Sequence, residues 1–313
     1  MTLTGNTFFF PWEVSLEVSL QSVLPRSLIT VISFFSAFGE EIFLILLLGF
    51  MYWSYDKAAG KRIGLSVLAG SIWVPMVKNI ALRRRPYFDH TEIQILRPVE
   101  PGADLYDISA QGYSFPSGHS TNAVTTMGSL AYHYKKSWLK VLAILIPLLV
   151  GFSRVVVGAH YPTDVMAGWL IGSLAVFLIP WLEKKLPNRN TLYALMLAIS
   201  VPGLFYCRST DFFTGFGLLV GFICGSMIEE KKVNFENTRN PLRMVLRVLG
   251  GGAIYFILNT LLKLPFSANF LESGTTSALM VRAVRYAVIG VLEFSIYPIL
   301  FKYTAKLKFL GKP

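Results

Sequence analysis

Charged residues are scarce in this chain of 313 residues. Only 15% of its residues are charged, whereas a soluble domain carries about 25%. Apolar residues make up 53% of the chain, and the mean hydropathy is +0.53. This balance argues against one large soluble core and indicates that a lipid bilayer is the solvent for much of the chain.

Other features are missing as well. The chain has only two cysteines, Cys207 and Cys224, both in apolar stretches, so we expect small buried hydrophobic side chains rather than a disulfide. Residues 1–13 contain no lysine or arginine, which argues against a signal peptide, and we expect no cleavage. No internal repeat, low-complexity tract or Gly/Ser-rich linker is present.

Long apolar runs are abundant. A transmembrane helix needs about 20 mainly apolar residues. Nine stretches meet this requirement approximately: 27–53, 63–82, 117–134, 138–158, 163–182, 191–207, 212–228, 245–264 and 279–301. Before them, Trp12 to Arg26 is amphipathic and suits the membrane interface. We therefore predict an all-α, polytopic transmembrane helix bundle.

The net charge of +11 has a topological explanation. Of the 29 lysines and arginines, 18 lie in alternate connections or in the tail: 57–62, 135–140, 184–189, 231–247 and 302–312. The positive-inside rule places these segments on the cytoplasmic side. We expect the N-terminus outside, the C-terminus in the cytoplasm, and no nucleic-acid partner.

Two acidic residues, Glu40 and Glu41, interrupt the first span. Carboxylates at membrane depth are candidates for function. They equally suit a helix break near the end of the span, and the sequence favours neither interpretation. The long outer connection 83–116 is likewise open, because such a loop is often functional but also suits a merely solvated link.

A first polar cluster runs from Lys78 to Pro86 and contains Arg83-Arg84-Arg85. Lys78 and Arg85 are seven residues apart, nearly two helical turns, so both side chains point the same way if the helix continues. Their cations suit phosphate oxygens. For Arg83 and Arg84 we favour snorkelling, in which a long side chain reaches from the apolar zone to water.

A second cluster, Phe115-Pro116-Ser117-Gly118-His119-Ser120, opens the third span. Ser117 can cap the helix, and Gly118 lets a ligand approach the backbone closely. Free N–H groups at a helix start bind anions, and His119 can transfer a proton near neutral pH. Alone, this cluster would equally suit an ordinary cap beside an interfacial histidine.

A third cluster joins the fourth span to the fifth. It contains Ser153-Arg154, His160, Pro162 and Asp164. Pro162 suits the first turn of a new helix, so Asp164 can reach back to the His160 imidazole, fix its tautomer and stabilise its charged form. The topology places all three clusters at one membrane face.

The three clusters contain Lys-x6-Arg-Pro, Pro-Ser-Gly-His and Ser-Arg-x5-His-x3-Asp, complete and in this order. They resemble the signature motifs of the type 2 phosphatidic acid phosphatase superfamily. The resemblance covers residues 78–164 and, by the layout of the spans, 27–207. The superfamily also includes soluble acid phosphatases and vanadium haloperoxidases, and the apolar spans favour its membrane branch.

The resemblance implies a role for each matching residue. His160 is the nucleophile that takes the phosphoryl group, Asp164 orients it, and His119 is first the acid for the leaving oxygen and then the base for water. Five residues hold the phosphate oxygens: Lys78, Arg85, Ser117, Gly118 and Arg154. With this many donors we expect no metal and no cofactor.

We therefore expect an integral-membrane lipid phosphatase with an interfacial segment over 1–26, a six-span core over 27–207 and about three additional spans over 208–313. Its substrate would be a lipid phosphate or diphosphate at the outer leaflet of a bacterial plasma membrane. Candidates are undecaprenyl diphosphate, phosphatidylglycerophosphate and phosphatidic acid. The alternative is a transporter or sensor that binds a lipid phosphate without turnover. The sequence does not define the oligomeric state.

Overall fold

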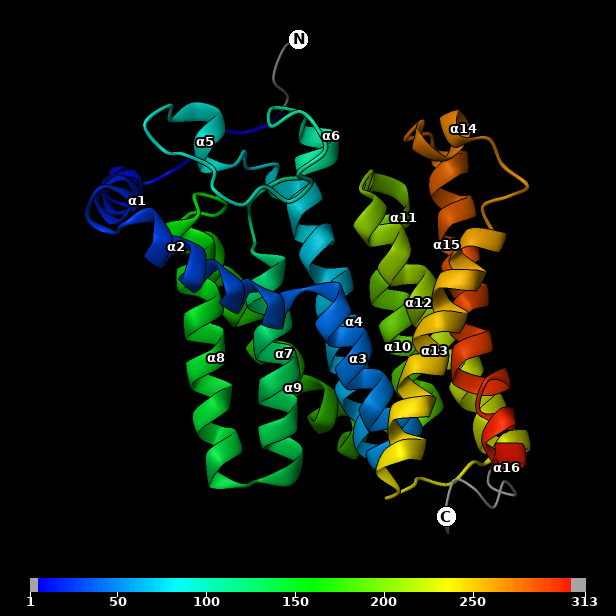
Figure 1. The fold of residues 1–313 in the computed structure, drawn as a ribbon. Helices are drawn as coiled ribbons and strands as arrows, with labels where there is room; N and C mark the ends of the chain where they lie inside the picture. Colours follow the sequence, from blue (N-terminus) through cyan, green and yellow to red (C-terminus); the bar gives the residue numbers. More distant parts are fainter. Residues whose placement is uncertain (1–4, 305–313) are drawn as a thin grey trace. The chain divides into compact units, whose positions relative to one another are not determined.

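A computed structural model describes residues 5–304, and this range is built from helices with no strand (Figure 1). The predicted all-α polytopic bundle is confirmed. Among the described residues, six helical segments are long and apolar enough to span a bilayer. They are Lys57–Ala81, Ser137–Val156, Pro162–Lys185, Thr210–Val233, Pro241–Leu261 and Thr276–Tyr303. The basic tail residues Lys306, Lys308 and Lys312 lie outside the described residues.

The chain forms two compact units. The first comprises residues up to 44 together with 69–181, and the second comprises 45–68 and 182–313. Each unit therefore takes part of helix α4 (Lys57–Ala81). The division at residue 207 rests on the family resemblance and stays a prediction.

The first unit begins with two helices, α1 (Pro11–Val23) and α2 (Arg26–Ser33). Helix α2 continues directly into a 3₁₀ segment, η1 (Phe34–Gly39). The axis bends by 115° between Pro11–Val23 and Arg26–Gly39. Helix α1 covers most of the stretch predicted to be amphipathic, but its acidic residues Glu13 and Glu17 face inward while the apolar Trp12 and Leu16 are exposed. Its placement in the membrane interface stays a prediction.

The predicted first span is broken after η1. Glu40 lies in extended backbone, and helix α3 (Glu41–Gly49) begins at the next residue. The Glu40 carboxylate pairs with Arg97 of the connection between α4 and α7, whereas Glu41 is exposed. The two carboxylates therefore lie at a helix break, which is the second of the interpretations that the sequence left open.

Three long helices complete the first unit: α7 (Gly118–Tyr134), α8 (Ser137–Val156) and α9 (Pro162–Lys185). Glycines on α9 let α7 approach closely, because a Cβ atom at Gly168 would lie 2.5 Å from the Ser117 carbonyl oxygen. A Cβ atom at Gly172 would lie 2.7 Å from Val124. Small residues thus set the distance between these two helices.

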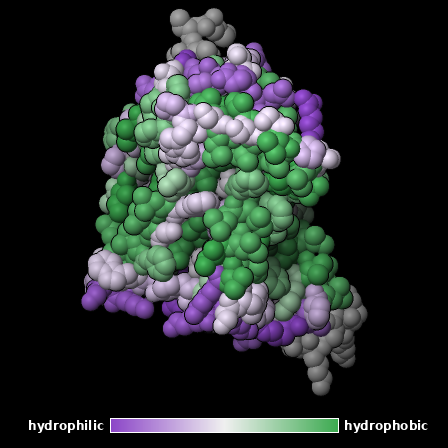
Figure 2. Space-filling model, turned by 90° about the vertical axis from the view of Figure 1, so that its left-hand side faces the viewer, coloured by the Kyte–Doolittle hydropathy of each residue, from purple (hydrophilic) through white to green (hydrophobic). Residues whose placement is uncertain are grey.

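Helix α8 presents an apolar face outward. Figure 2 shows apolar side chains over this face of the first unit, with polar residues above and below. The exposed apolar residues of α8 are Trp138, Val141, Ile144, Leu145, Leu148 and Phe152. Such a face requires an apolar solvent, which agrees with a transmembrane helix.

The long connection between α4 and α7 carries two short helices, α5 (Pro86–Asp89) and α6 (Ile108–Gln111). The buried Gln111 amide accepts the backbone N–H groups of Val99 and Glu100. Asn6 pairs with the backbone on either side of Arg83. The connection is therefore tied down by hydrogen bonds rather than merely solvated.

The second unit is centred on α12 (Thr210–Ile228) and α15 (Thr276–Val291), which touch through glycines. A Cβ atom at Gly217 would lie 2.2 Å from the Ala283 carbonyl oxygen. The unit also contains η2 (Phe50–Tyr55), α10 (Arg189–Ser200), α11 (Gly203–Tyr206), η3 (Glu229–Val233), α13 (Pro241–Leu261), α14 (Ala268–Glu272), η4 (Leu292–Ile296) and α16 (Ile299–Thr304). The predicted span 191–207 is divided between α10 and α11 at Pro202, which lacks the N–H group that a continuous helix needs.

The second unit contains a buried ion-pair cluster and both cysteines. Glu229 is fully buried and pairs with Lys57 at 2.8 Å and with Lys61 at 2.9 Å. Both cysteines are free, as predicted. Cys207 is buried, but Cys224 is exposed on α12, so the prediction of burial was wrong for Cys224.

Candidate active site

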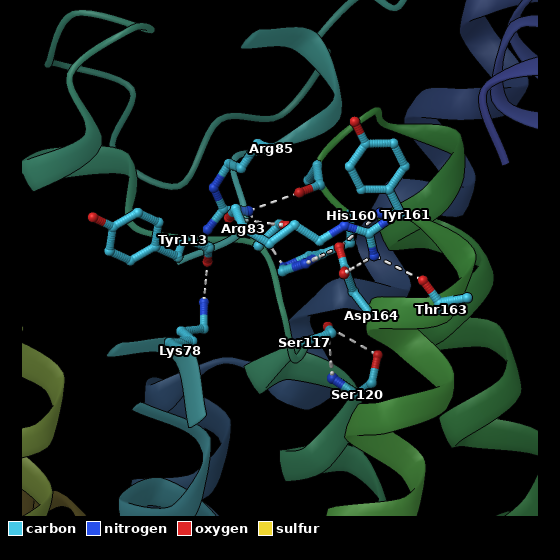
Figure 3. A network of polar contacts seen from close by, with 12 residues as sticks. Lys78, Arg83, Arg85, Tyr113, Ser117, Ser120, His160, Tyr161, Thr163 and Asp164 are labelled. Atoms are coloured by element: carbon cyan, nitrogen blue, oxygen red, sulfur yellow. Dashed lines mark hydrogen bonds and ion pairs between the residues drawn. The ribbon is translucent and has the colours of Figure 1, made fainter. Parts of the chain in front are cut away.

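The first cluster reaches the site by a turn and not by helical periodicity. Helix α4 ends at Ala81, Leu82 takes a left-handed conformation (φ 52°), and Arg85 has extended backbone before α5. The prediction that Lys78 and Arg85 point the same way required a continuous helix from 78 to 85, and the helix ends before Arg85. Both cations still belong to one polar network, in which Lys78 donates to the Tyr113 carbonyl oxygen (Figure 3).

The Arg85 guanidinium is buried and held by main-chain oxygens. Its Nε donates to the carbonyls of Gln111 and Gly112 at 2.9 and 3.0 Å, and its Nη1 donates to the Ala159 carbonyl at 2.7 Å. The same Nη1 lies 3.3 Å from Nε2 of His160. A fixed cation therefore stands beside the imidazole nitrogen that would attack phosphorus.

Arg83 behaves differently from the snorkelling that we favoured. Its side chain is 1% exposed, and Nη1 donates to Asp164 Oδ1 at 2.7 Å while Nη2 donates to Glu13 Oε2 at 2.7 Å. The prediction for Arg83 was wrong, because the bend between α1 and α2 brings a buried carboxylate to it. Arg84 pairs with Asp89 at 2.6 Å and is also largely covered.

The second cluster opens α7 as predicted. The Ser117 hydroxyl accepts hydrogen bonds from the backbone N–H and the hydroxyl of Ser120, at 3.4 and 3.0 Å. Gly39 lies against His119, since a Cβ atom at Gly39 would be 2.6 Å from the His119 carbonyl oxygen. The 3₁₀ segment η1 thus packs directly on the start of α7.

Arg154 lies near the end of α8 and is 2% exposed. Its Nη1 donates to the Ser36 hydroxyl at 3.3 Å, and its Nε makes no hydrogen bond. A buried guanidinium with a donor to spare is suited to an anionic ligand.

The third cluster forms the centre of the site. His160 is 2% exposed, and its Nδ1 lies 3.5 Å from Oδ2 of the fully buried Asp164. The same Oδ2 accepts the Tyr161 N–H at 2.9 Å, which anchors the carboxylate at the first turn of α9. Nδ1 of His160 has no hydrogen bond at this separation. A shift of a few tenths of an ångström would close it, as is common when a substrate enters.

Burial lowers the pKa of His160 well below its usual value, and the next largest cause is the charge of Arg85, followed by Lys78 and Arg154. An imidazole with such a pKa is neutral at pH 7, because the free side chain titrates near pH 6.5. A neutral imidazole carries the lone pair that a nucleophile needs.

The structure brings all eight predicted residues into the first unit: Lys78, Arg85, Ser117, Gly118, His119, Arg154, His160 and Asp164. Their catalytic and binding roles stay predictions. Sequence reasoning missed Glu13, Arg83 and Ser36. The spacing of Glu13 and Glu17, four residues apart in an apolar segment, was a signal for a buried acidic face on α1.

Comparison with known proteins agrees with this arrangement. The PAP2 superfamily domain matches residues 59–187, and the transmembrane extension of PAP2 superfamily phosphatases matches residues 213–308. These matches and the apolar helices define a phosphatase embedded in a membrane. The chain belongs to the PAP2 superfamily, which is the superfamily that its three motifs resemble.

Three curated relatives carry the names of lipid phosphatases. The chain is 29% identical over 162 residues to an undecaprenyl-diphosphatase of Sulfolobus acidocaldarius, covering 50% of this chain and 71% of the relative. It is 35% identical over 88 residues to phosphatidylglycerophosphatase B of Bacillus subtilis, covering 25% and 43%. It is 30% identical over 139 residues to a lipid A 4'-phosphatase of Bacteroides thetaiotaomicron, covering 42% and 60%. No solved structure matches the chain.

Proposed function

We propose that the protein hydrolyses the phosphomonoester or diphosphate of a membrane lipid through a phosphohistidine at His160. The observation that carries the proposal is the placement of this imidazole between opposite charges. Nε2 faces the Arg85 guanidinium at 3.3 Å, and Nδ1 faces the Asp164 carboxylate at 3.5 Å. The cation attracts the phosphate to Nε2, and the carboxylate stabilises the charge that the ring acquires.

In the first step, Nε2 of His160 attacks phosphorus, and the bond from phosphorus to the leaving oxygen breaks. His119 donates a proton to that oxygen. In the second step, His119 takes a proton from water, the water oxygen bonds to phosphorus, and the phosphorus–nitrogen bond breaks to release phosphate. Lys78, Arg85, Arg154 and the N-terminus of α7 neutralise the charge on the phosphate oxygens throughout.

The substrate is a lipid because of where the site lies. The helices that carry it have outward apolar faces, as on α8, and the head group of a bilayer lipid reaches the end of such a helix without leaving the membrane. The names of the relatives support a lipid diphosphate or monophosphate. The lysine and arginine distribution supports an outer-leaflet site and a cytoplasmic C-terminus in a bacterial plasma membrane.

Phosphate release by the purified protein tests the proposal. The panel is undecaprenyl diphosphate, phosphatidylglycerophosphate and phosphatidic acid in mixed micelles, each with and without EDTA. We expect turnover of at least one lipid and no loss of rate with the chelator. Binding of the whole panel without release from any member would overturn the proposal in favour of a lipid-phosphate transporter or sensor.

A further inference from the structure

Behind Asp164, on the side away from His160, lies a continuous set of buried charges. Asp164 Oδ1 accepts Arg83 Nη1 at 2.7 Å, and Arg83 Nη2 donates to Glu13 Oε2 at 2.7 Å. All three side chains are at most 1% exposed. The Arg83 guanidinium also stacks over the Tyr161 ring at 4.0 Å, which further fixes its plane.

The other oxygen of Glu13 holds the start of α9. Oε1 accepts the Thr163 backbone N–H at 3.0 Å and the Thr163 hydroxyl at 2.5 Å. Thr163 immediately precedes Asp164 in the first turn of the helix. Helix α1 therefore reaches Asp164 by two routes, one through Arg83 and one through the main chain of α9.

We propose that Glu13 is a positioning residue for phosphoryl transfer, which sets the orientation of Asp164 and the charge that His160 faces. The inference rests on the proposed function and deepens it. Neither the family motifs nor the names of the relatives assign a role to a residue of the N-terminal helix.

Glu13 also changes the net charge of the buried cluster. Asp164 and Arg83 alone form a neutral pair, which would stabilise a charged imidazole weakly. Glu13 adds one negative charge, so the three side chains together carry a net charge of −1. When His160 accepts the phosphoryl group, Nδ1 keeps its proton and the ring becomes positive. A net negative cluster stabilises that ring, and the interaction is strong because all members are shielded from water.

Glu17 offers a matched control. It lies one helical turn from Glu13 on the same buried face of α1 and is equally unexposed, but neither of its oxygens makes a hydrogen bond. Glu17→Gln therefore tests the effect of replacing a buried carboxyl on this helix face without breaking the connection to Arg83.

The experiment compares wild type, Glu13→Gln, Glu13→Asp and Glu17→Gln by lipid phosphate turnover and by calorimetric binding of two inorganic probes. Orthovanadate bonds to the nucleophile as a transition-state analogue, whereas inorganic phosphate reports ground-state binding. In Glu13→Gln we expect kcat and vanadate affinity to fall by about 10- to 100-fold, the scale of lost outer-shell partners. KM and phosphate affinity should stay within about twofold, because Glu13 does not touch the phosphate.

Glu13→Asp keeps the charge and should retain most of the vanadate affinity. If Glu13→Gln does not fold, the comparison of Glu13→Asp with wild type is the test. Glu17→Gln should match wild type in the ratio of vanadate to phosphate affinity. An unchanged ratio in Glu13→Gln, or an equal loss in Glu13→Asp, would overturn the inference. If wild type releases no phosphate from any lipid while its vanadate affinity still depends on Glu13, the proposed function fails and the positioning role stands.

Discussion

The backbone N–H of Ser117 donates to the backbone carbonyl of Asp164 at 2.9 Å. This main-chain hydrogen bond joins the start of α7, where we propose that the phosphate binds, to the first turn of α9, which carries the carboxylate beside His160. Among substitutions at either position, only Ser117→Pro removes it directly, because proline has no backbone N–H. The close approach of Gly168 to Ser117 keeps the two helices at the distance that the bond requires.

Gly168→Ala should therefore damage both stability and activity. The added methyl group would meet the Ser117 carbonyl oxygen at 2.5 Å, and overpacking of this kind costs about 1–3 kcal/mol. Thermal unfolding in detergent and phosphate release measure the two effects. Gly252→Ala is the control, because a Cβ atom there meets nothing within 4 Å and lies in helix α13. It should be neutral or stabilising by up to about 1 kcal/mol.

His160→Asn removes the nucleophile and leaves a side chain of similar size. We expect phosphate release to fall by at least about 1,000-fold, as for other nucleophiles that act in a unit with a base. Labelling with a ³²P-lipid, quenched in alkaline detergent because a phosphohistidine is acid-labile, should yield a phosphoenzyme from wild type and none from the variant. Surviving turnover with an intact melting transition would show that another group is the nucleophile.

His119→Asn should affect substrates according to their leaving group. A lipid alkoxide needs the proton that His119 supplies, whereas p-nitrophenolate leaves without one. In single-turnover measurements, we expect phosphoenzyme formation from the lipid to slow by about 100-fold or more. Formation from p-nitrophenyl phosphate should slow far less. Equal losses on both substrates would contradict the role of His119 as the acid.

The pH profile tests the environment of His160. Burial and then the cations lower its pKa, so the neutral nucleophile persists as the pH falls below about 6.5. The acid limb of kcat/KM should lie below that value. Lys78→Gln removes one cation and should raise the pKa, which moves the limb to higher pH.

Wild type and Lys78→Gln are compared on the same substrate, so that titration of the substrate phosphate affects both pH profiles equally. The charged or titratable groups that face His160 are Lys78, Arg85, His119, Arg154 and Asp164. A limb that does not move in Lys78→Gln would mean that this cation does not act on the nucleophile.

Cysteine labelling tests the side of the membrane. After Cys207 and Cys224 are replaced by serine, we expect a membrane-impermeant maleimide to label Thr91→Cys in intact cells. Glu236→Cys should react only after permeabilisation. Both positions are exposed in the structure. The reverse pattern would place the site on the cytoplasmic side while leaving its chemistry intact.

The apolar spans and the three polar clusters could be predicted from sequence because each depends on local signals. Hydropathy marks helices such as α8, a serine before a glycine marks the start of α7, and Pro162 marks the start of α9. The topology of the spans places all three clusters at the same membrane face, which predicted that the clusters lie close together. These inferences needed no knowledge of side-chain contacts.

Arg83 could not be interpreted in the same way. Its partner Glu13 lies 70 residues away in the chain, on a helix whose axis bends by 115° before the next helix. Likewise, Ser36 looks like an ordinary residue of an apolar span until η1 places it 3.3 Å from Arg154. Such contacts depend on helix bending, which hydropathy does not encode.

The bond between Glu13 and Thr163 spans 150 residues of sequence. During synthesis, helix α1 is made before the long helices α4, α7 and α8, and its partner Thr163 emerges only after all three. Its two acidic residues must meanwhile remain hydrated or protonated, because a bilayer offers them no counter-ion. Completion of the site is therefore a late event in biogenesis, and a chain stopped before residue 163 cannot assemble it.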